Sequence, residues 1–192
     1  MGHREQLLAA ARQLLEDKGY AHITARDLVA ASGTNLASIG YHFGSKAGLL
    51  NAALETVFEE WTTQLASIAM ADPDTSPIER AHLTWAAHLD SLTPRRALLV
   101  SFVEALAQAD RDPRLREQLA GMYRNTRRRV AELVAAALGP DTPPEDPRCT
   151  AVASWVMAVC EGLSMQWLLD PTATPAGEDL LRGLADLRAI SE

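Results

Sequence analysis

The chain has 192 residues, of which 47% are hydrophobic and 22% charged, so it can form one large or two small soluble domains with a real core. This composition excludes a disordered chain, and the net charge of −7 gives no general attraction for a polyanion. Cys149 and Cys160 lie 11 residues apart in one predicted helix, too far for an intrachain disulfide, and no cysteine–histidine spacing supports a metal site.

The N-terminus and the apolar segments indicate a cytoplasmic protein. The first twenty residues combine acidic side chains with helical periodicity, which is not the pattern of a signal peptide. The longest apolar run, residues 151–160, is shorter than the roughly 20 residues that a transmembrane helix needs. We therefore expect no membrane-spanning segment.

Residues 4–18 predict the first helix, because leucine and alanine recur along one helical stripe. Thr24 is suited to cap a second helix at about residues 25–31, since its hydroxyl can accept a hydrogen bond from a free backbone N–H. Gly33 is expected to end this helix, because glycine adopts positive φ without a Cβ clash. The chain can therefore turn sharply at this point.

A third short helix follows the turn at once. Asn35 is suited to cap it, and the helix is expected at about residues 36–42, with Ile39 as its one clearly buried residue. Two short helices on either side of such a tight break are typical of a helix-turn-helix. Residues 24–43 therefore predict a DNA-reading motif.

The rest of the chain predicts only helices, since no alternating strand pattern occurs. Pro77, Pro94 and Pro113 each mark a helix start. The fold class is therefore all-α with about nine helices, of which the later ones are expected at about residues 46–70, 77–92, 93–109, 112–138, 148–169 and 176–189.

Several residues of the N-terminal quarter resemble the TetR family of bacterial one-component repressors. They are Gly19-Tyr20, Thr24, Gly33 and, most specifically, the run YHFGSK at 41–46 followed by Leu49-Leu50. The resemblance implies a helix-turn-helix DNA-binding domain of three helices over residues 1–46. It also implies a larger helical domain for effector binding and dimerisation over residues 47–192.

The charge distribution reconciles an acidic protein with DNA binding. Residues 1–50 carry five basic and four acidic side chains, a net charge of +1, so the rest of the chain carries −8. A few cations, helix N-termini and polar side chains can supply local phosphate contacts, while the acidic body opposes loose nonspecific binding. Modest affinity for each subunit favours a dimer that engages two half-sites.

The resemblance assigns DNA contacts residue by residue. Tyr41 and Lys46 match positions that resemble phosphate clamps, and Thr24 and Arg26 are placed for backbone or groove-edge contacts. The third helix is expected to meet bases or their flanking phosphates, although His42 could instead pack or cap. Gly40 departs from the family pattern, which often has an aromatic residue there. The full set is Thr24, Arg26, Asn35, Leu36, Ala37, Ser38, Gly40, Tyr41, His42 and Lys46.

An effector site is expected inside the C-terminal helices, where aromatic walls and a few polar groups are typical of small-molecule sites. The same pattern also describes plain core, which is the commoner use of aromatic residues at helical spacing. The Arg127-Arg128-Arg129 run is more typical of a solvated face. The effector-binding set is Trp85, His88, Phe102, Glu104, Tyr123, Arg127, Trp155 and Cys160.

A dimer interface is expected on the last two helices. The penultimate helix is apolar on more than one side, so the core of one protomer does not need all of it, and the pair can form a four-helix bundle with a second copy. The alternative is an ordinary buried helix. The interface set is Val152, Trp155, Val156, Val159, Gly162, Leu163, Leu180, Leu184 and Leu187.

These features predict a homodimeric, sequence-specific transcription regulator that acts as a repressor on a palindromic double-stranded DNA operator and is released by a small apolar ligand. One alternative is a DNA-binding regulator controlled by a protein partner, with no small-molecule pocket. A helical enzyme is a further alternative, but the sequence holds no GxGxxG, P-loop, GxSxG or HExxH motif. We expect no catalytic residue, cofactor or metal.

Overall fold

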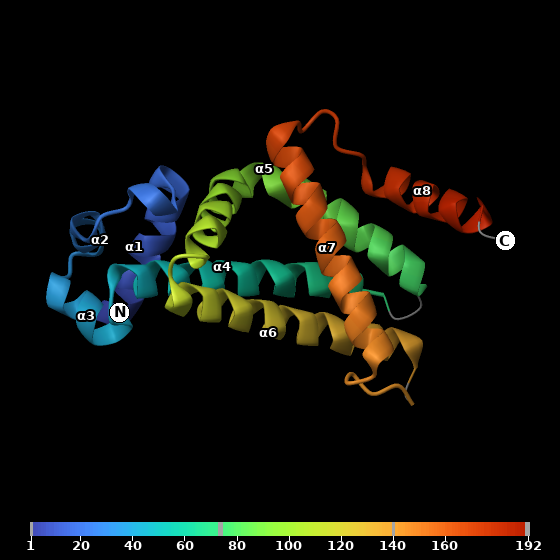
Figure 1. The fold of residues 1–192 in the computed structure, drawn as a ribbon, viewed down its shortest axis with the longest axis horizontal. Helices are drawn as coiled ribbons and strands as arrows, with labels where there is room; N and C mark the ends of the chain where they lie inside the picture. The colour runs from blue at the N-terminus through green and yellow to red at the C-terminus, as the bar shows by residue number, and fades with distance from the viewer. Residues whose placement is uncertain (1, 73–74, 140, 191–192) are drawn as a thin grey trace. The chain divides into compact units, whose positions relative to one another are not determined.

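The computed structural model describes residues 2–72, 75–139 and 141–190, and every regular element in this part of the chain is a helix (Figure 1). This confirms the all-α class, and eight α-helices with one short 3-10 helix are close to the expected number. The elements are α1 (His3–Lys18), η1 (Tyr20–His22), α2 (Ala25–Ser32), α3 (Leu36–Phe43), α4 (Lys46–Ala69), α5 (Pro77–Ala109), α6 (Pro113–Leu138), α7 (Pro147–Leu169) and α8 (Gly177–Ile190).

The two short motif helices begin at the predicted caps. Thr24 Oγ1 accepts a hydrogen bond from the N–H of Asp27 at 3.2 Å, and the Asp27 carboxylate accepts one from the N–H of Thr24 at 2.8 Å, which completes a capping box. Asn35 Oδ1 accepts from the N–H of Ser38 at 3.0 Å. Gly33 ends α2 with φ of 65°, in the left-handed region that favours glycine.

One expected helix boundary is wrong. The sequence predicts a new helix at Thr93-Pro94, but α5 is continuous from Pro77 to Ala109 with Pro94 inside it. Proline removes one helical hydrogen bond, yet its fixed φ is itself helical. Leu92 and Leu98 are buried on either side of it. Packing on both sides therefore keeps the segment helical through the proline.

The chain divides into two compact units. Unit 1 comprises residues 1–61 and 94–124, and unit 2 comprises residues 62–93 and 125–192. Helices α4, α5 and α6 each contribute residues to both units. The expected DNA-binding segment, residues 1–46, lies wholly in unit 1, together with part of each of these three helices.

The core of unit 1 joins the N-terminal helices to later ones. Leu7, Leu15, Leu28 and Ile39 from α1, α2 and α3 pack in one buried cluster with leucines of α4. Leu98 and Ala105 of α5 complete this cluster. The DNA-reading helices therefore share a core with α4 and α5 and do not form a separate one.

Buried and half-buried hydrogen bonds reinforce this core. The Tyr20 hydroxyl donates to Asn51 Oδ1 at 2.8 Å, and Asn51 Nδ2 donates to Gln118 Oε1 of α6 at 2.6 Å. Glu104 of α5 accepts from the N–H of Ala21 at 3.0 Å. Side chains of α4, α5 and α6 thus hold the segment between α1 and α2.

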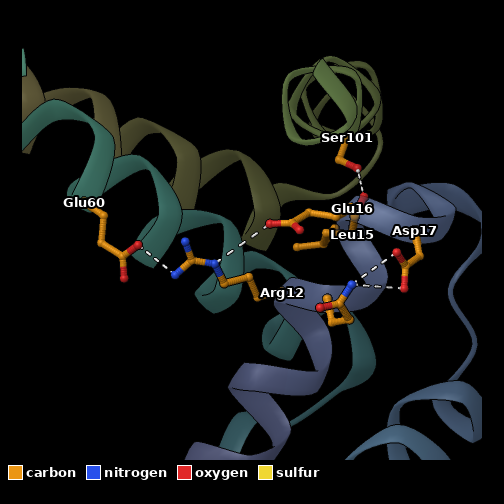
Figure 2. Close-up of polar contacts among 7 residues, drawn as sticks. Arg12, Leu15, Glu16, Asp17, Glu60 and Ser101 are labelled. Atoms are coloured by element: carbon orange, nitrogen blue, oxygen red, sulfur yellow. Dashed lines mark hydrogen bonds and ion pairs between the residues drawn. The ribbon is translucent and has the colours of Figure 1, made fainter. Parts of the chain in front are cut away.

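Figure 2 shows two further attachments of α1. The Ser101 hydroxyl of α5 donates to the carbonyl of Leu15 at 3.0 Å, near the end of α1. Arg12 pairs with Glu60 of α4 at 2.7 Å. The exposed Arg12 pair contributes little stability, whereas the buried Ser101 bond satisfies a helix-end carbonyl that would otherwise lack a partner.

Unit 2 has its own small core. The ring centroids of Trp85 on α5 and Trp155 on α7 lie 5.5 Å apart in an edge-on arrangement. A Cβ on Gly177, the first residue of α8, would lie 3.1 Å from the backbone nitrogen of Ala86, so α8 begins in close contact with α5. The buried contacts between α6 and α7 use small residues, which are Ala131, Ala135, Cys149 and Ala153.

Helix α7 is, among the described residues, the one helix long and apolar enough to cross a membrane by length and composition alone. Single helices of this kind also occur in proteins that do not enter membranes. Only 17% of its most apolar window is buried, so much of α7 is not covered by the rest of the protomer.

Tyr20→Phe should destabilise the fold by about 1 kcal/mol, because it removes a buried hydrogen bond to Asn51. Burial, aided by the charge of Asp112, raises the pKa of Tyr20 to about 12. The unfolded chain therefore loses this proton first, and the wild type should lose stability between about pH 10 and 12, more than Tyr20→Phe does. Urea unfolding across this pH range measures both effects.

The matched control for this variant is Tyr41→Phe, which changes a tyrosine that is 86% exposed and should leave the free energy of unfolding unchanged. Equal stability of all three proteins would show that the Tyr20 bond contributes nothing to the fold.

Candidate functional site

The exposed part of α3 is the candidate DNA-reading surface. Tyr41 is 86% exposed and Leu36 is 57% exposed, both unusual for large apolar or aromatic side chains in a globular unit. Ala37 and Gly40 are also exposed between them, whereas Ile39 is buried and anchors the helix. An exposed face of small and apolar residues can enter a groove and contact base edges such as a thymine methyl group.

Ser38 takes a different place from the one expected. It is buried, and its hydroxyl bonds to Asn35 Oδ1 and lies 3.2 Å from His3 Nδ1. These contacts hold the start of α3 against the start of α1. A role in orienting α3 therefore fits Ser38 better than direct base contact.

Lys46 has a structural partner in addition to its predicted one. Its ammonium group donates to the carbonyl of Ile23 at 2.7 Å, which ties the first residue of α4 to the segment before α2. An ammonium has three N–H donors, so two stay available for a phosphate. Thr24 is exposed, but its side chain takes part in the capping box of α2. Arg26 is also exposed.

His42 is half-buried between aromatic neighbours. Its ring stands edge-on to Tyr41 with centroids 4.8 Å apart and lies 6.2 Å from that of Phe43. This geometry favours the packing role that the sequence left open. It also supports the exposed Tyr41 ring in one orientation.

Two residues at the chain start were missed by the sequence analysis. His3 contacts Ser38, and the Arg4 guanidinium lies over the Phe43 ring at 5.5 Å. Both are exposed, and both bring basic groups to α3. The only sequence signal was a pair of basic residues at positions 3 and 4, whose place beside α3 depends on tertiary packing.

The predicted effector residues fall into two groups. Phe102, Glu104 and Tyr123 belong to unit 1. The ring centroid of Phe102 lies 4.3 Å from that of Phe58 and 6.3 Å from that of Tyr123, on which the ring is stacked. Glu104 is engaged with the backbone N–H of Ala21. These three residues therefore have structural contacts within unit 1.

The second group lies in unit 2 and comprises Trp85, His88, Arg127, Trp155 and Cys160. His88 Nε2 lies 3.0 Å from the carbonyl of Cys160 and 2.9 Å from the Ser164 hydroxyl, so it links α5 to α7. Burial lowers the pKa of His88 to about 4, which makes it neutral near pH 7. Burial, with a smaller effect of Glu161, raises the pKa of Cys160 to about 12, so its thiol is not a reactive thiolate.

The predicted interface residues lie partly on the exposed face of α7. Val152 and Trp155 are 41% and 43% exposed, and the space that a Cβ on Gly162 would occupy is open. Leu163 differs, because it is buried within the protomer. Leu180 is half-buried, and the side chains of Leu184 and Leu187 lie outside the described part of the structure.

Two family models match the chain. One, described as bacterial regulatory proteins of the tetR family, matches residues 7–53. The other, described as BetI-type transcriptional repressor, C-terminal, matches residues 77–187, which is more than half of the chain. Together they span both the helix-turn-helix and the later helices.

Individual relatives agree with these models. The HTH-type transcriptional regulator CymR of Pseudomonas putida is 34% identical over 116 residues, which cover 58% of this chain and 53% of that protein. The chain thus matches about half the length of this curated relative.

Solved structures show the same fold. The multidrug binding protein EbrR, in a complex with proflavin, has a TM-score of 0.68 and 26% identity, with 97% of this chain and 99% of that one covered. A transcriptional regulator from Rhodococcus sp. Rha1 has a TM-score of 0.69 and 17% identity, with 94% of each chain covered.

In His88→Gln, the free energy of unfolding should depend less on pH below neutral pH than it does in the wild type. Because the pKa of His88 is lowered to about 4 in the fold, the unfolded chain binds this proton first, and the wild type should lose up to about 3 kcal/mol as the pH falls from 6.5 to 4. Unfolding measured by circular dichroism across this range tests it. The exposed His22→Gln should keep the wild-type profile, and an equally steep profile for His88→Gln would contradict the assignment.

Proposed function

The chain belongs to the tetR family of bacterial regulatory proteins, and we propose that it is a DNA-binding transcriptional repressor that acts as a homodimer on a near-palindromic operator. This family consists of transcription regulators, which is not an enzyme class. The observation that carries the proposal is the capped, exposed α3, held by a core shared with α4 and α5. Because its proposed target is a DNA operator, we expect the protein to act in the cytoplasm.

In this proposal α3 enters the major groove. Leu36, Ala37 and Gly40 face the base edges, where their small or apolar surfaces suit thymine methyl groups and close backbone approach. Tyr41 and Lys46 contact phosphates on one side of the helix, and Arg4 adds a cation at the start of α1. Phosphate contacts fix the register of α3 in the groove, and base contacts supply the sequence preference.

Dimerisation through α7 and α8 supplies the second half-site. The exposed apolar side chains of α7 need a cover in water, and a second copy of the same helix provides a self-complementary one. Two α3 helices related by a two-fold axis then fit half-sites about one DNA turn apart.

A small molecule bound in unit 2 is proposed to release the DNA. It would favour a conformation in which α4 shifts, and this would change the spacing of the two reading helices. The relative EbrR, complexed with proflavin, supports a small-molecule effector in this fold. The ligand needs only to bind the two conformations with different affinities.

A selection from random duplex DNA with the purified protein, followed by sequencing, tests the proposed function. We expect enrichment of an inverted repeat, since a symmetric dimer reads the same half-site twice. Failure of a folded, dimeric protein to enrich any sequence would contradict sequence-specific operator binding.

Tyr41→Phe should weaken binding about fivefold on every operator variant, because it removes one hydrogen bond to a phosphate. Leu36→Ala should instead change the preference at one base step. Fluorescence anisotropy on a set of single-base operator variants separates the two patterns. Leu138→Ala, an exposed change at the end of α6, is the control with wild-type affinity. A uniform loss from Leu36→Ala would contradict its role in base reading.

Val152→Glu should convert the dimer to a monomer and weaken operator binding, because it places a charge in an apolar symmetric interface. Light scattering coupled to size-exclusion chromatography measures the oligomeric state. Leu138→Glu adds the same charge at an exposed leucine of α6 and should stay dimeric. An unchanged Val152→Glu dimer would place the interface elsewhere.

A further inference from the structure

The first residue of α1, His3, lies on the reading helix α3. Its ring nitrogen Nδ1 is 3.2 Å from the hydroxyl of Ser38, the third residue of α3, and the start of α1 lies beside α3 in Figure 1. Ser38 is only 8% exposed, whereas His3 is exposed. At this position the imidazole ring, and not the serine, is therefore the group that a ligand of α3 meets.

The proton count of this contact fixes which atom donates. The N–H of Ser38 can only donate, and its acceptor at 3.0 Å is Oδ1 of Asn35, so the Asn35 amide turns its oxygen toward Ser38. The Ser38 hydroxyl lies 3.2 Å from the same oxygen, so its one proton is donated there. The hydroxyl oxygen can then only accept from His3, which means that Nδ1 of His3 carries a proton.

A proton on Nδ1 leaves two states for the other ring nitrogen of His3. In the neutral imidazole Nε2 is an acceptor, and in the imidazolium it is an N–H donor on a positively charged ring. Nε2 makes no hydrogen bond to any residue that the structure describes. The charge state of His3 therefore decides whether this nitrogen repels an anion or binds it, while Nδ1 keeps its contact with Ser38 in both states.

His3 lies on the flank of α3 that also carries Tyr41. Ser38 and Tyr41 are three residues apart, a spacing at which side chains are neighbours on a helix, with Cβ atoms about 5–6 Å apart. A helix with its side chains is about 10–12 Å wide and the major groove is about 12 Å wide, so groups on the flank of a bound helix face a wall of phosphates. In the proposed complex His3 and Tyr41 face the same wall.

The charged neighbours of His3 leave the net charge of this turn to the imidazole. The titratable and charged groups on the first turn of α1 and on α3 are Arg4, Glu5, Tyr41 and His42. The Arg4 guanidinium lies over the ring of Phe43, at the other end of α3. The Glu5 carboxylate accepts from the N–H of Gly2 at 3.0 Å. Arg4 and Glu5 carry opposite charges, so protonation of His3 decides whether this turn is neutral or positive.

We propose that His3 is a proton-linked phosphate contact, in which the imidazolium is held by Nδ1–H on Ser38 and donates Nε2–H to an operator phosphate on the Tyr41 side of α3. This inference rests on the proposed function, because it adds a contact to the same DNA surface. Histidine is the side chain whose charge changes between about pH 5 and 8. Operator binding takes up a proton at His3, so the operator is bound more tightly as the pH falls through this range.

Operator affinity at pH 6 and pH 8 tests the proposal, with the full-length protein and the duplex that the random selection enriches. The wild type should bind about tenfold more tightly at pH 6, since each protomer of the dimer gains a charge-assisted hydrogen bond. His3→Asn keeps an N–H donor at the place of Nδ1 and lacks Nε2, so its affinity should stay near the wild-type value at pH 8 throughout. Equal pH dependence of the two proteins would overturn the proposal.

The salt dependence of operator binding is a readout that a purely structural role of His3 would not change. Each phosphate that a cation neutralises adds about 0.9 to the slope of log affinity against log salt concentration, so the wild-type dimer should have a slope steeper by about 2 at pH 6 than at pH 8. His3→Asn should have equal slopes at the two pH values. A wild-type slope that is the same at both pH values would overturn the phosphate contact.

Two further variants assign the effect to this site. His22→Asn changes an exposed histidine of η1 and should keep the wild-type pH dependence. Ser38→Ala removes the acceptor of the Nδ1–H and should weaken binding at pH 6 more than at pH 8, because the imidazolium is no longer held beside α3. An equal loss at both pH values would overturn the role of Ser38 in holding His3.

The same measurements separate this inference from the proposed function. An enriched operator that the wild type and His3→Asn bind with the same pH and salt dependence would leave the proposed function in place and overturn this inference alone. A folded, dimeric protein that enriches no sequence at either pH would overturn both.

Discussion

The attachment of the chain between α1 and α2 to later helices is the constraint on which the reading surface depends. Two short helices and one longer one have too little apolar surface to fix their own orientation, so α4, α5 and α6 supply the missing contacts. The Tyr20 hydroxyl donates a hydrogen bond to Asn51, and the N–H of Ala21 donates one to Glu104. Because these groups are directional, they set the orientation of α1 and α2 more sharply than apolar packing alone. The proposed dimeric repressor needs this, since its two α3 helices must keep a fixed orientation to fit two half-sites together.

Local chemistry explains why the motif could be predicted from the sequence. Thr24 and Asn35 cap helices through bonds to residues three positions away, and Gly33 supplies the left-handed turn between them. Such interactions depend on a few neighbouring residues, so their pattern survives in the sequence. The all-α class follows for the same reason, because helical periodicity is also local. Pro94 shows the limit, since whether a proline ends a helix or lies within it depends on burial on both sides.

Roles that depend on distant contacts could not be predicted. Ser38 and Lys46 are predicted to contact DNA, and the structure adds partners at His3 and Ile23, which lie 35 and 23 residues away in the sequence. Glu104 was noticed because it interrupts an apolar run, yet its partner, Ala21, lies 83 residues earlier. Sequence spacing identifies that such a group must be solvated, paired or used. It cannot choose among these outcomes, because the partner is set by the fold.

The two units differ in how completely they satisfy their polar groups, and this difference agrees with a division of labour. Unit 1 pairs its buried Asn51 and Ser101, as expected for a part whose geometry must not change when DNA binds. In unit 2 the indole nitrogen of Trp85, Nδ1 of His82 and Nε of Arg127 make no hydrogen bond within the described part of the chain. A ligand can shift a conformational equilibrium only by its difference in affinity for the two states.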